Sequence, residues 1–223
     1  MRVALYYLPA LVDPLWHIGT SWLGRDVETN APAAQPDIAN IAEVTANARM
    51  YGFHATLKPP MALLAGTGWD AVVTASMDVA ADIAPFDLPA LEIADVAGFL
   101  ALRDAVPSVR LQALADACVS GLDHLRAPPG EAELARRRRS KLTSEQEAML
   151  VRWGYPHVFA TWFFHMTLTR RLTAAELAVY RPWAEELFGD TLRAPRRVTD
   201  ICLCTQASPG EPFRLAERLP LRG

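Results

Sequence analysis

Two histidine motifs of matching composition stand far apart in this chain. The first is Phe-His-Ala-Thr-Leu at residues 53–57, and the second is Phe-His-Met-Thr-Leu at residues 164–168. Each motif places an imidazole and a hydroxyl two residues apart, and residues two apart share one face of a β-strand. If both segments are strands, each histidine lies beside its threonine, opposite the apolar neighbours. The four polar residues of the motifs are His54, Thr56, His165 and Thr167.

Two imidazoles and two hydroxyls suit chemistry on a phosphodiester. One neutral imidazole can take the proton of the attacking water or hydroxyl, while the other, charged, protonates the leaving oxygen on the far side of the phosphorus. The hydroxyls can donate to the non-bridging oxygens, where negative charge grows in the transition state. If a pseudo-twofold axis relates two halves of the chain, all four side chains converge on one cleft. This scheme requires no metal and no cofactor.

Histidines outside such motifs call for a different interpretation. A lone histidine in a half-buried strand is usually a satisfied core residue, and His17, His124 and His157 are predicted to be structural. A zinc site is a further alternative, but the chain has no His-x-His, Cys-x-x-Cys or His-Glu-x-x-His spacing. The matched contexts of His54 and His165 favour a catalytic role for these two.

Residues that follow the motifs are candidates for binding substrate phosphate. Strand alternation carries the face of the first motif onward to Lys58, and that of the second motif to Thr169 and Arg171. For each of the two cations, an exposed position at a strand end is an equally good interpretation. By the same alternation, Arg170 is expected to point away.

A polar segment at about 128–157 separates the second motif from the preceding helix. Its Thr143-x-x-Gln146 pattern resembles a capping box at the start of a helix. A run of four arginines before it is interpreted either as a solvated helix face or as a cap over a cleft that binds a second phosphate of the substrate. Charge alone does not choose between these interpretations. The run is Arg136, Arg137, Arg138 and Arg139.

Composition limits the classes to which the chain can belong. It has 223 residues, of which 51% are hydrophobic and 21% charged, a globular balance that excludes disordered, collagen-like and coiled-coil classes. The formal net charge of −3 provides no global positive field for long nucleic acid or an anionic membrane. Three cysteines without metal spacing indicate a reducing compartment.

No segment of the sequence is typical of a membrane span. The uncharged stretch 153–169 has 17 residues and includes two His and three Thr, so it is too short and too polar. The apolar start, residues 3–12, is interpreted as a first strand rather than a signal peptide. We therefore expect a cytoplasmic protein.

The elements that must position the motifs occur twice in a similar order. The first half covers about 1–95, and the second about 96–223 with a helical insertion at about 128–157. Pro59 and Pro60 are expected to stop the first motif strand. Expected strands are residues 2–8, 50–57, 86–93, 98–103, 161–169, 198–204 and 213–219. Expected helices are residues 14–24, 69–83, 108–126 and 174–188.

With these motifs, the whole chain resembles the 2H phosphoesterase superfamily, named for two His-x-Thr/Ser motifs. The resemblance implies a duplicated α+β fold in one bilobal domain, residues 1–223, whose antiparallel sheets form a central cleft. It also implies metal-independent cleavage or closure of 2′,3′-cyclic or related phosphodiesters. The residues at the superfamily's motif positions are His54, Thr56, His165 and Thr167.

A narrower resemblance is to a subfamily of phosphonate-metabolism proteins known as DUF1045. It is carried by Tyr-Gly-Phe-His-Ala-Thr-Leu-Lys-Pro-Pro at 51–60 and Trp-Gly-Tyr-Pro at 153–156. The subfamily's association with carbon–phosphorus lyase gene clusters implies a small substrate such as a phosphoribosyl cyclic phosphate. The terminal phosphate of that substrate gives purpose to Lys58, Arg171 or the arginine run. Tyr155 lines the site in this interpretation, although packing accounts for it equally well.

Three functions remain open at this point. The first is a hydrolase that acts on a small cyclic phosphodiester of phosphonate catabolism. The second is an RNA-end 2′,3′-cyclic phosphodiesterase or 2′-5′ ligase-like enzyme, which the net charge and the lack of a long basic stripe disfavour. The third is a non-catalytic module that binds a phosphate ligand. Intact His and Thr in both motifs disfavour it, because binding alone does not require two titratable groups.

Overall fold

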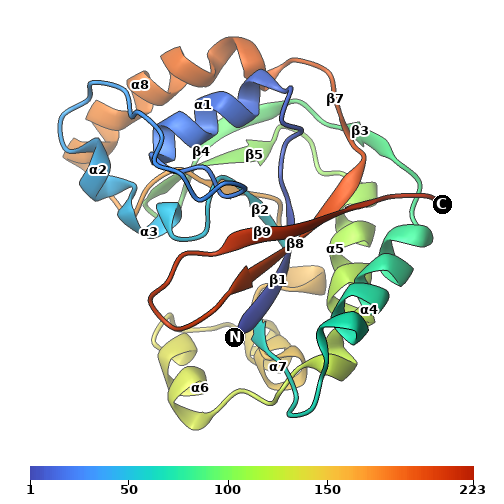
Figure 1. Ribbon diagram of the computed structural model, residues 1–223. Helices are drawn as coiled ribbons and strands as arrows, with labels where there is room; N and C mark the ends of the chain where they lie inside the picture. Colours follow the sequence, from blue (N-terminus) through green and yellow to red (C-terminus); the bar gives the residue numbers. More distant parts are fainter.

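The computed structural model describes all 223 residues, which form an α+β structure (Figure 1). Seven strands form one sheet in the order β4-β5-β6-β2-β1-β8-β9, and β3 pairs with β7 in a separate sheet. Every pairing is antiparallel, which confirms the predicted fold class. The strands are β1 (Arg2–Tyr7), β2 (Ala55–Ala62), β3 (Phe86–Leu88), β4 (Leu91–Val96), β5 (Phe99–Asp104), β6 (Met166–Thr167), β7 (Arg196–Val198), β8 (Asp200–Gln206) and β9 (Arg214–Pro220).

Apart from β9 at one edge, the strand order is symmetric about the β6–β2 pair. β5 flanks β6 as β1 flanks β2, and β4 and β8 follow outward on the two sides. β4, near the end of the first half, pairs with β5 of the second half, while β8 of the second half pairs with β1 of the first. Strands of both halves are therefore mixed in one sheet, and the two strands that carry the motifs are neighbours at its centre.

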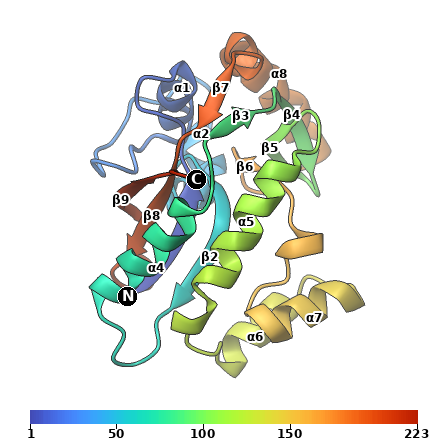
Figure 2. The ribbon, with the colours of Figure 1, turned by 90° about the vertical axis from the view of Figure 1, so that its right-hand side faces the viewer.

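Helices cover the sheet and extend beyond it. α4 and α5 lie side by side, and α5 packs against β2 (Figure 2). α6 and α7 lie together at one end of the molecule (Figures 1 and 2), within the segment of about 128–157 that was expected to be a helical insertion. None of the helices combines the length and the hydropathy that crossing a membrane would require. The helices are α1 (Pro14–Leu23), α2 (Ile41–Val44), α3 (Ala46–Arg49), α4 (Trp69–Ala81), α5 (Val109–Gly121), α6 (Glu131–Arg138), α7 (Ser144–Trp153) and α8 (Ala174–Leu192).

Local sequence explains where the helices begin. The predicted capping box is present: the Thr143 hydroxyl accepts from the Gln146 N–H, and the Gln146 side chain accepts from the Thr143 N–H. Thr173 and Glu176 form the same arrangement at the start of α8. These caps satisfy N–H groups that have no partner within the helix, so the insertion and α8 start at defined residues.

The first motif strand differs from the prediction at both ends. Residues 50–57 were expected to be extended, but a turn follows the end of α3 at Arg49, and β2 begins only at Ala55. β2 then continues through Pro59 and Pro60, which were expected to end it. The register between β1 and β2 shifts where the prolines lie. Such an irregularity tolerates residues that lack a backbone N–H.

Two other predicted strands are interrupted. Of residues 161–169, only Met166 and Thr167 form β6, and a 3-10 turn at Phe159–Thr161 precedes them. Residues 86–93 are divided between two sheets, because Pro89 separates β3 from β4 and a proline cannot donate to a ladder. The apolar patterns thus located the strands but did not show how much of each one is paired.

Candidate active site

The pairing of β2 with β6 sets the two motifs opposite each other. Ala55 pairs with Met166 in an antiparallel register at the centre of the sheet. On one face of such a pair, opposite Cβ atoms lie about 4.5–5.5 Å apart and diagonal neighbours about 7–8 Å. The motif residues lie one position to either side of this pair. They form two opposed pairs, His54 with Thr167 and His165 with Thr56.

Both imidazoles are held by backbone carbonyls in the same way. His54 Nδ1 lies 2.9 Å from the carbonyl oxygen of Gly52, and His165 Nδ1 lies 3.1 Å from that of Phe163. Because a carbonyl oxygen can only accept, Nδ1 carries the hydrogen in each ring. Nε2 is then the atom left to accept or, in the charged ring, to donate. The Nε2 atom of His54 lies 3.1 Å from the Thr56 hydroxyl.

Gly52 makes the first of these arrangements possible. Its φ of 81° lies in the left-handed region, and a Cβ at this position would collide with the Val27 side chain. The turn before β2 therefore requires glycine, and it aims the Gly52 carbonyl at the imidazole of His54.

The surroundings of His54 favour its neutral form. The Tyr6 ring packs against it with centroids 3.9 Å apart, and the Tyr51 ring lies at 6.1 Å. Burial lowers the pKa of His54 to about 4; the charges of His165 and Arg25 act in the same direction, and the backbone hydrogen bond opposes them. Tyr6 was not predicted as a site residue, because nothing distinguishes it within an apolar strand. Its hydroxyl is buried without a hydrogen-bond partner.

His165 is also surrounded by aromatic rings. Phe163 lies 4.8 Å and Phe99 6.2 Å from it, measured between centroids. Burial lowers the pKa of His165; its hydrogen bond to a carbonyl opposes this, and the charges of His157 and Arg103 add to it. The surroundings of both motif imidazoles therefore favour the neutral form.

Arg103 is a cation near the motifs that the sequence interpretation missed. β5 pairs with β6 so that Ala101 is opposite Thr167, which places Arg103 beside His165. The guanidinium lies 4.8 Å from the centroid of the Phe163 ring and forms no ion pair. Only the pairing of β5 with β6 reveals this position, since Arg103 ends an apolar segment far from either motif in sequence.

A small cavity of about 160 Å³ is lined by His54 of the first motif and Thr167 of the second. Thr169, predicted to bind substrate, lines it; its hydroxyl accepts from the Leu100 N–H at 3.0 Å and keeps its own hydrogen to donate. The cavity therefore presents groups from both halves of the chain to one space. Its lining consists of Asn47, Ala48, Tyr51, Gly52, His54, Thr167 and Thr169.

Lys58 does not lie on the motif face, and that prediction is wrong. Tyr6 pairs with Thr56, but the next residue of β1, Leu5, pairs with Lys58. Leu57 is thus an extra residue in β2, a bulge that reverses the alternation beyond it. Strict alternation from the first motif fails at this point.

The ammonium of Lys58 instead reaches the end of α5. Its Nζ donates to the carbonyl oxygen of Val119 at 2.9 Å and lies 3.8 Å from the Asp123 carboxylate. The side chain is 2% exposed. Val119 supplies one of the last carbonyls of α5, which lack partners inside the helix. Lys58 therefore has a structural role in this fold.

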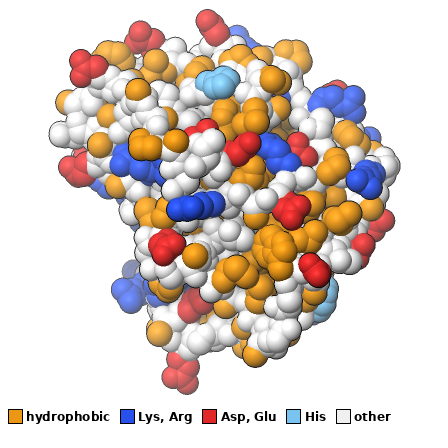
Figure 3. All heavy atoms as spheres, viewed as in Figure 1, with side chains coloured by type: hydrophobic (Ala, Val, Ile, Leu, Met, Phe, Trp, Pro, Cys, Tyr) orange, Lys and Arg blue, Asp and Glu red, His pale blue; other side chains and the backbone are white.

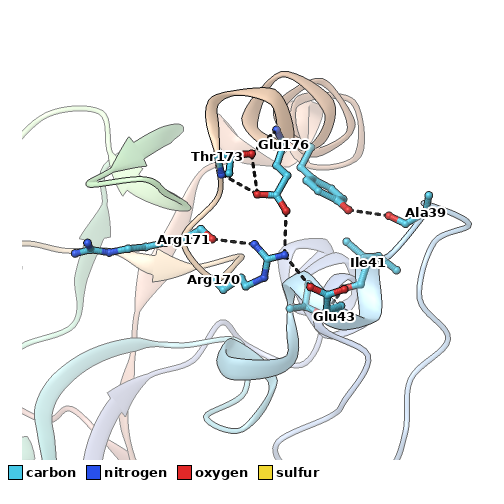
Figure 4. A network of polar contacts seen from close by, with 9 residues as sticks. Ala39, Ile41, Glu43, Arg170, Arg171, Thr173 and Glu176 are labelled. Atoms are coloured by element: carbon cyan, nitrogen blue, oxygen red, sulfur yellow. Dashed lines mark hydrogen bonds and ion pairs between the residues drawn. The ribbon is translucent and has the colours of Figure 1, made fainter.

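The two arginines after the second motif point in different directions. Arg170 bonds to Glu43 at 2.8 Å and Glu176 at 2.9 Å, which links α2 to α8 and confirms that it points away from the motif (Figure 4). Arg171 is exposed and forms no side-chain hydrogen bond or ion pair. Its side chain extends away from Arg170 toward β4 and β5, drawn in green in Figure 4. Its role in substrate binding stays a prediction.

One member of the arginine run differs from its neighbours. The side chains of Arg136 and Arg138 are 59% and 47% exposed, which agrees with a solvated face, whereas that of Arg137 is 14% exposed. The Arg137 guanidinium lies 4.5 Å from the centroid of the Tyr155 ring, which in turn contacts His157. The run is therefore split, with one guanidinium directed inward.

Metal-binding residues do not gather in this structure. No group of three or more His, Cys, Asp or Glu side chains is arranged to hold a metal ion. Cys118, Cys202 and Cys204 are free and buried, and burial raises the pKa of each thiol.

Two solved structures align with the whole chain at low sequence identity. One is described as a crystal structure of phosphoesterase, 14% identical, with a TM-score of 0.46; the alignment covers 100% of this chain and 98% of that one. The other is E. coli LigT complexed with NADP+, 14% identical, with a TM-score of 0.44 and the same coverage.

Sequence comparison finds much closer relatives. A protein of Janthinobacterium sp. (strain Marseille) named ribose 1,5-bisphosphate phosphokinase PhnN is 37% identical over 231 residues, which covers 100% of this chain and 51% of that protein. The protein of the same name from Laribacter hongkongensis (strain HLHK9) is 36% identical, with 96% and 50% covered. The chain thus spans about half the length of these relatives. A family model described as protein of unknown function (DUF1045) matches residues 56–214, more than half of the chain, and the chain therefore belongs to the DUF1045 family.

Proposed function

We propose that this protein is a metal-independent phosphodiesterase that hydrolyses a small cyclic phosphate ester. One observation carries the proposal: the β2–β6 register sets His54 opposite Thr167 and His165 opposite Thr56 on one face. Each imidazole is fixed through Nδ1 to a carbonyl, so that Nε2 is left for proton transfer. The motif residues thus supply a base, an acid and two hydroxyl donors, which are the groups that a phosphodiester reaction needs.

In the proposed reaction, one histidine takes a proton from the attacking water while the other gives a proton to the leaving oxygen. A neutral Nε2 accepts a proton from water as the water oxygen bonds to phosphorus. The other imidazole, charged, gives its proton to the ester oxygen as the bond from that oxygen to phosphorus breaks. The product is a phosphate monoester, and the two rings have exchanged protonation states. An anionic phosphate beside a buried imidazole favours the charged ring and so supplies the acid.

The substrate class is inferred from the relatives and from the sequence resemblance. Both curated relatives are named for an activity on ribose 1,5-bisphosphate. The DUF1045 resemblance implies phosphonate catabolism, and a phosphoribosyl cyclic phosphate combines a phosphorylated ribose with a cyclic ester. We therefore propose a substrate of this kind for the residues of the two motifs, with Thr169 and Tyr155 lining the site.

The phosphokinase activity in the relatives' names is a second candidate, but the sequence of this chain disfavours it. A P-loop needs glycine directly before its lysine, whereas Lys58 follows leucine and Lys141 follows serine, and the chain has no other lysine. An RNA-end enzyme is also disfavoured. On the face shown in Figure 3, Lys and Arg side chains are scattered among acidic and apolar ones, without the stripe that tracks a nucleic-acid backbone.

Phosphorus NMR tests the proposal directly. Ribose 1,2-cyclic phosphate, with and without a 5-phosphate, and a nucleoside 2′,3′-cyclic phosphate are incubated with the protein in excess chelator. We expect ring opening of a ribose cyclic phosphate, with loss of turnover in His54→Ala and in His165→Ala. Exposed His17 on α1 provides the matched control, His17→Ala, which should retain full activity. Thr167→Val should slow the reaction by about 10²- to 10³-fold.

The outcomes separate the alternatives. Turnover of the nucleoside substrate alone would favour an RNA-end enzyme. Absence of turnover with every substrate, or full activity in either histidine variant, would contradict the proposal. Binding without turnover would leave a non-catalytic phosphate-binding module.

A further inference from the structure

The small cavity of about 160 Å³ extends the motif face in one direction. One side of it is lined by the opposed pair His54 and Thr167. Gly52 and Thr169 line it as well, and each lies two residues beyond a member of that pair, on the same face by alternation. The other two motif residues are not part of the lining. The cavity therefore lies beyond the His54–Thr167 pair, on the side away from the other pair.

No Asp, Glu, Lys or Arg side chain lines this cavity. A phosphate group placed in it would find no lysine or arginine to balance its charge. An uncharged group that both donates and accepts hydrogen bonds fits the lining better, and a sugar hydroxyl is such a group. The polar side chains available to it are Asn47, Tyr51, His54, Thr167 and Thr169.

Two of these side chains have hydrogen-bonding capacity that the chain does not use. Thr169 is 1% exposed, and its hydroxyl accepts from the Leu100 N–H at 3.0 Å but donates to no protein atom. The Asn47 amide, which is exposed, makes no hydrogen bond within the chain. Buried polar groups in folded proteins usually have partners, so a buried hydroxyl that lines a cavity with its hydrogen unused marks a place for a ligand acceptor.

The wall formed by α3 and Tyr51 is held in place by the rest of the fold. Arg49 of α3 donates through Nε to the carbonyl oxygen of Leu23 at 2.6 Å and through Nη2 to that of Ala42 at 2.9 Å. The Tyr51 ring stacks on the buried Phe213 ring, with centroids 5.4 Å apart and planes 16° apart. This wall is thus preformed, and its aromatic ring offers an apolar surface to the C–H groups of a ligand.

The position and the volume of the cavity both suit a sugar ring. In a cyclic phosphate of a sugar the ester oxygens belong to the sugar itself, so the sugar must lie directly beside the reacting phosphorus. The cavity meets this condition because His54 and Thr167 belong both to the motifs and to its lining. Its volume of about 160 Å³ is well below the roughly 300–1,000 Å³ of pockets that enclose drug-sized ligands, which suits a single ring.

We propose that the small cavity is the subsite for the sugar of the substrate, whose hydroxyls hydrogen-bond to Thr169 on its buried side and to Asn47 on its exposed side. This rests on the proposed function of the motif residues. The Thr169 hydroxyl donates to a sugar oxygen, and the Asn47 amide can donate to or accept from another. A substrate without these hydroxyls leaves both side chains without a partner, so the subsite selects a sugar over a bare cyclic ester.

The test compares two substrates with the same five-membered cyclic ester: ribose 1,2-cyclic phosphate, and ethylene glycol cyclic phosphate, which lacks the sugar. Wild type should prefer the ribose compound by about 100-fold or more in kcat/KM. Asn47→Ala and Thr169→Val should each lose about 5- to 50-fold for the ribose compound and less than threefold for the other, because only contacts to the sugar change. Thr169→Ser keeps the hydroxyl and should retain the preference.

Matched controls remove similar groups outside the cavity. Thr74→Val changes an exposed threonine of α4. Asn40→Gly removes an exposed amide at a position whose φ of 59° suits glycine. Both controls should keep the wild-type kcat/KM for both substrates, and thermal unfolding shows whether each variant is folded.

A binding measurement separates the subsite from the proposed function. His165 does not line the cavity, so His165→Ala should bind ribose 1,2-cyclic phosphate without turning it over. Calorimetry in this background should show an affinity that adding Asn47→Ala or Thr169→Val lowers about 5- to 50-fold. If wild type turns over neither substrate, the proposed function fails, and the calorimetry alone decides whether the subsite exists.

Several results would overturn the sugar subsite. These are equal kcat/KM for the two substrates in wild type, equal losses for both substrates in the variants, and an affinity that neither variant changes. A selective loss in only one of Asn47→Ala and Thr169→Val would overturn the assignment of the other residue.

Discussion

The two motif histidines meet opposing demands at the level of single residues. Burial favours a neutral imidazole and lowers the pKa of both His54 and His165, whereas the proposed reaction needs one of the rings charged. In the proposed reaction, a substrate phosphate would resolve this conflict by bringing negative charge next to both rings. The mechanism thus couples protonation of the acid to substrate binding.

This coupling predicts a particular dependence of activity on pH. The surroundings lower the pKa of both imidazoles from the ordinary value of histidine, that of His54 to about 4, so the singly protonated form is lost as pH rises through the higher of the two pKa values. The value of kcat/KM, which reports the free enzyme, should form a bell on the acid side of pH 6.5 and fall about tenfold per pH unit above it. The bell for kcat should lie at higher pH, because the bound anion raises the pKa of the acid. Initial rates between pH 4 and 9 measure both, and a flat kcat/KM from pH 5 to 8 would contradict the two-histidine mechanism.

Local spacing in the sequence predicted that His54 and Thr56 share a face, but it did not predict which residues of other strands lie beside them. His54 and Thr56 were predicted because a period of two within a short segment decides which side chains share a face. Tyr6 and Arg103 approach the same groups from β1 and β5, and their positions depend on which strands pair and in which register. Local spacing contains no information on that pairing.

At the level of elements, β2 shows where periodicity fails as a guide. Alternation predicts the direction of a side chain only while each residue has one partner on the next strand. The bulge at Leu57 breaks this condition, and Lys58 turns toward α5 instead of the motif face. A bulge has no dependable signature in the sequence, so the direction of Lys58 could not be predicted, while the helices and most strand positions could.

The new position of Lys58 predicts an effect on stability without an effect on catalysis. Replacing it in Lys58→Met leaves a buried carbonyl of α5 without its donor and should lower the free energy of unfolding by about 1–3 kcal/mol. Asp123 keeps Arg126 and Arg152 as partners. We expect kcat/KM to change less than twofold. Urea unfolding and initial rates test this against exposed Lys141→Met; a tenfold loss of kcat/KM at unchanged stability would return Lys58 to the substrate site.

At the level of the whole molecule, the duplication seen in the sequence does not produce two separate bodies. The pairs β6–β2 and β1–β8, at the centre of the sheet, each join a strand of one half to a strand of the other. The main hydrophobic core of 41 buried residues also draws on both halves. Order along the chain indicated the repeat, but the mixing of strands arises from tertiary pairing and could not be read from it.

This mixing predicts that the halves unfold together and do not fold separately. A fragment of residues 1–95 retains only the β1–β2 pairing, because the partners of β3 and β4 lie in the second half, and a two-stranded pair is marginal in water. We expect the fragment to give a disordered circular dichroism spectrum. In the full chain, hydrogen exchange in urea should report the same global free energy for amides of β1, β2 and β8. A folded 1–95 fragment, or a lower exchange free energy for all strands of one half, would show that the halves are independent units despite their shared sheet.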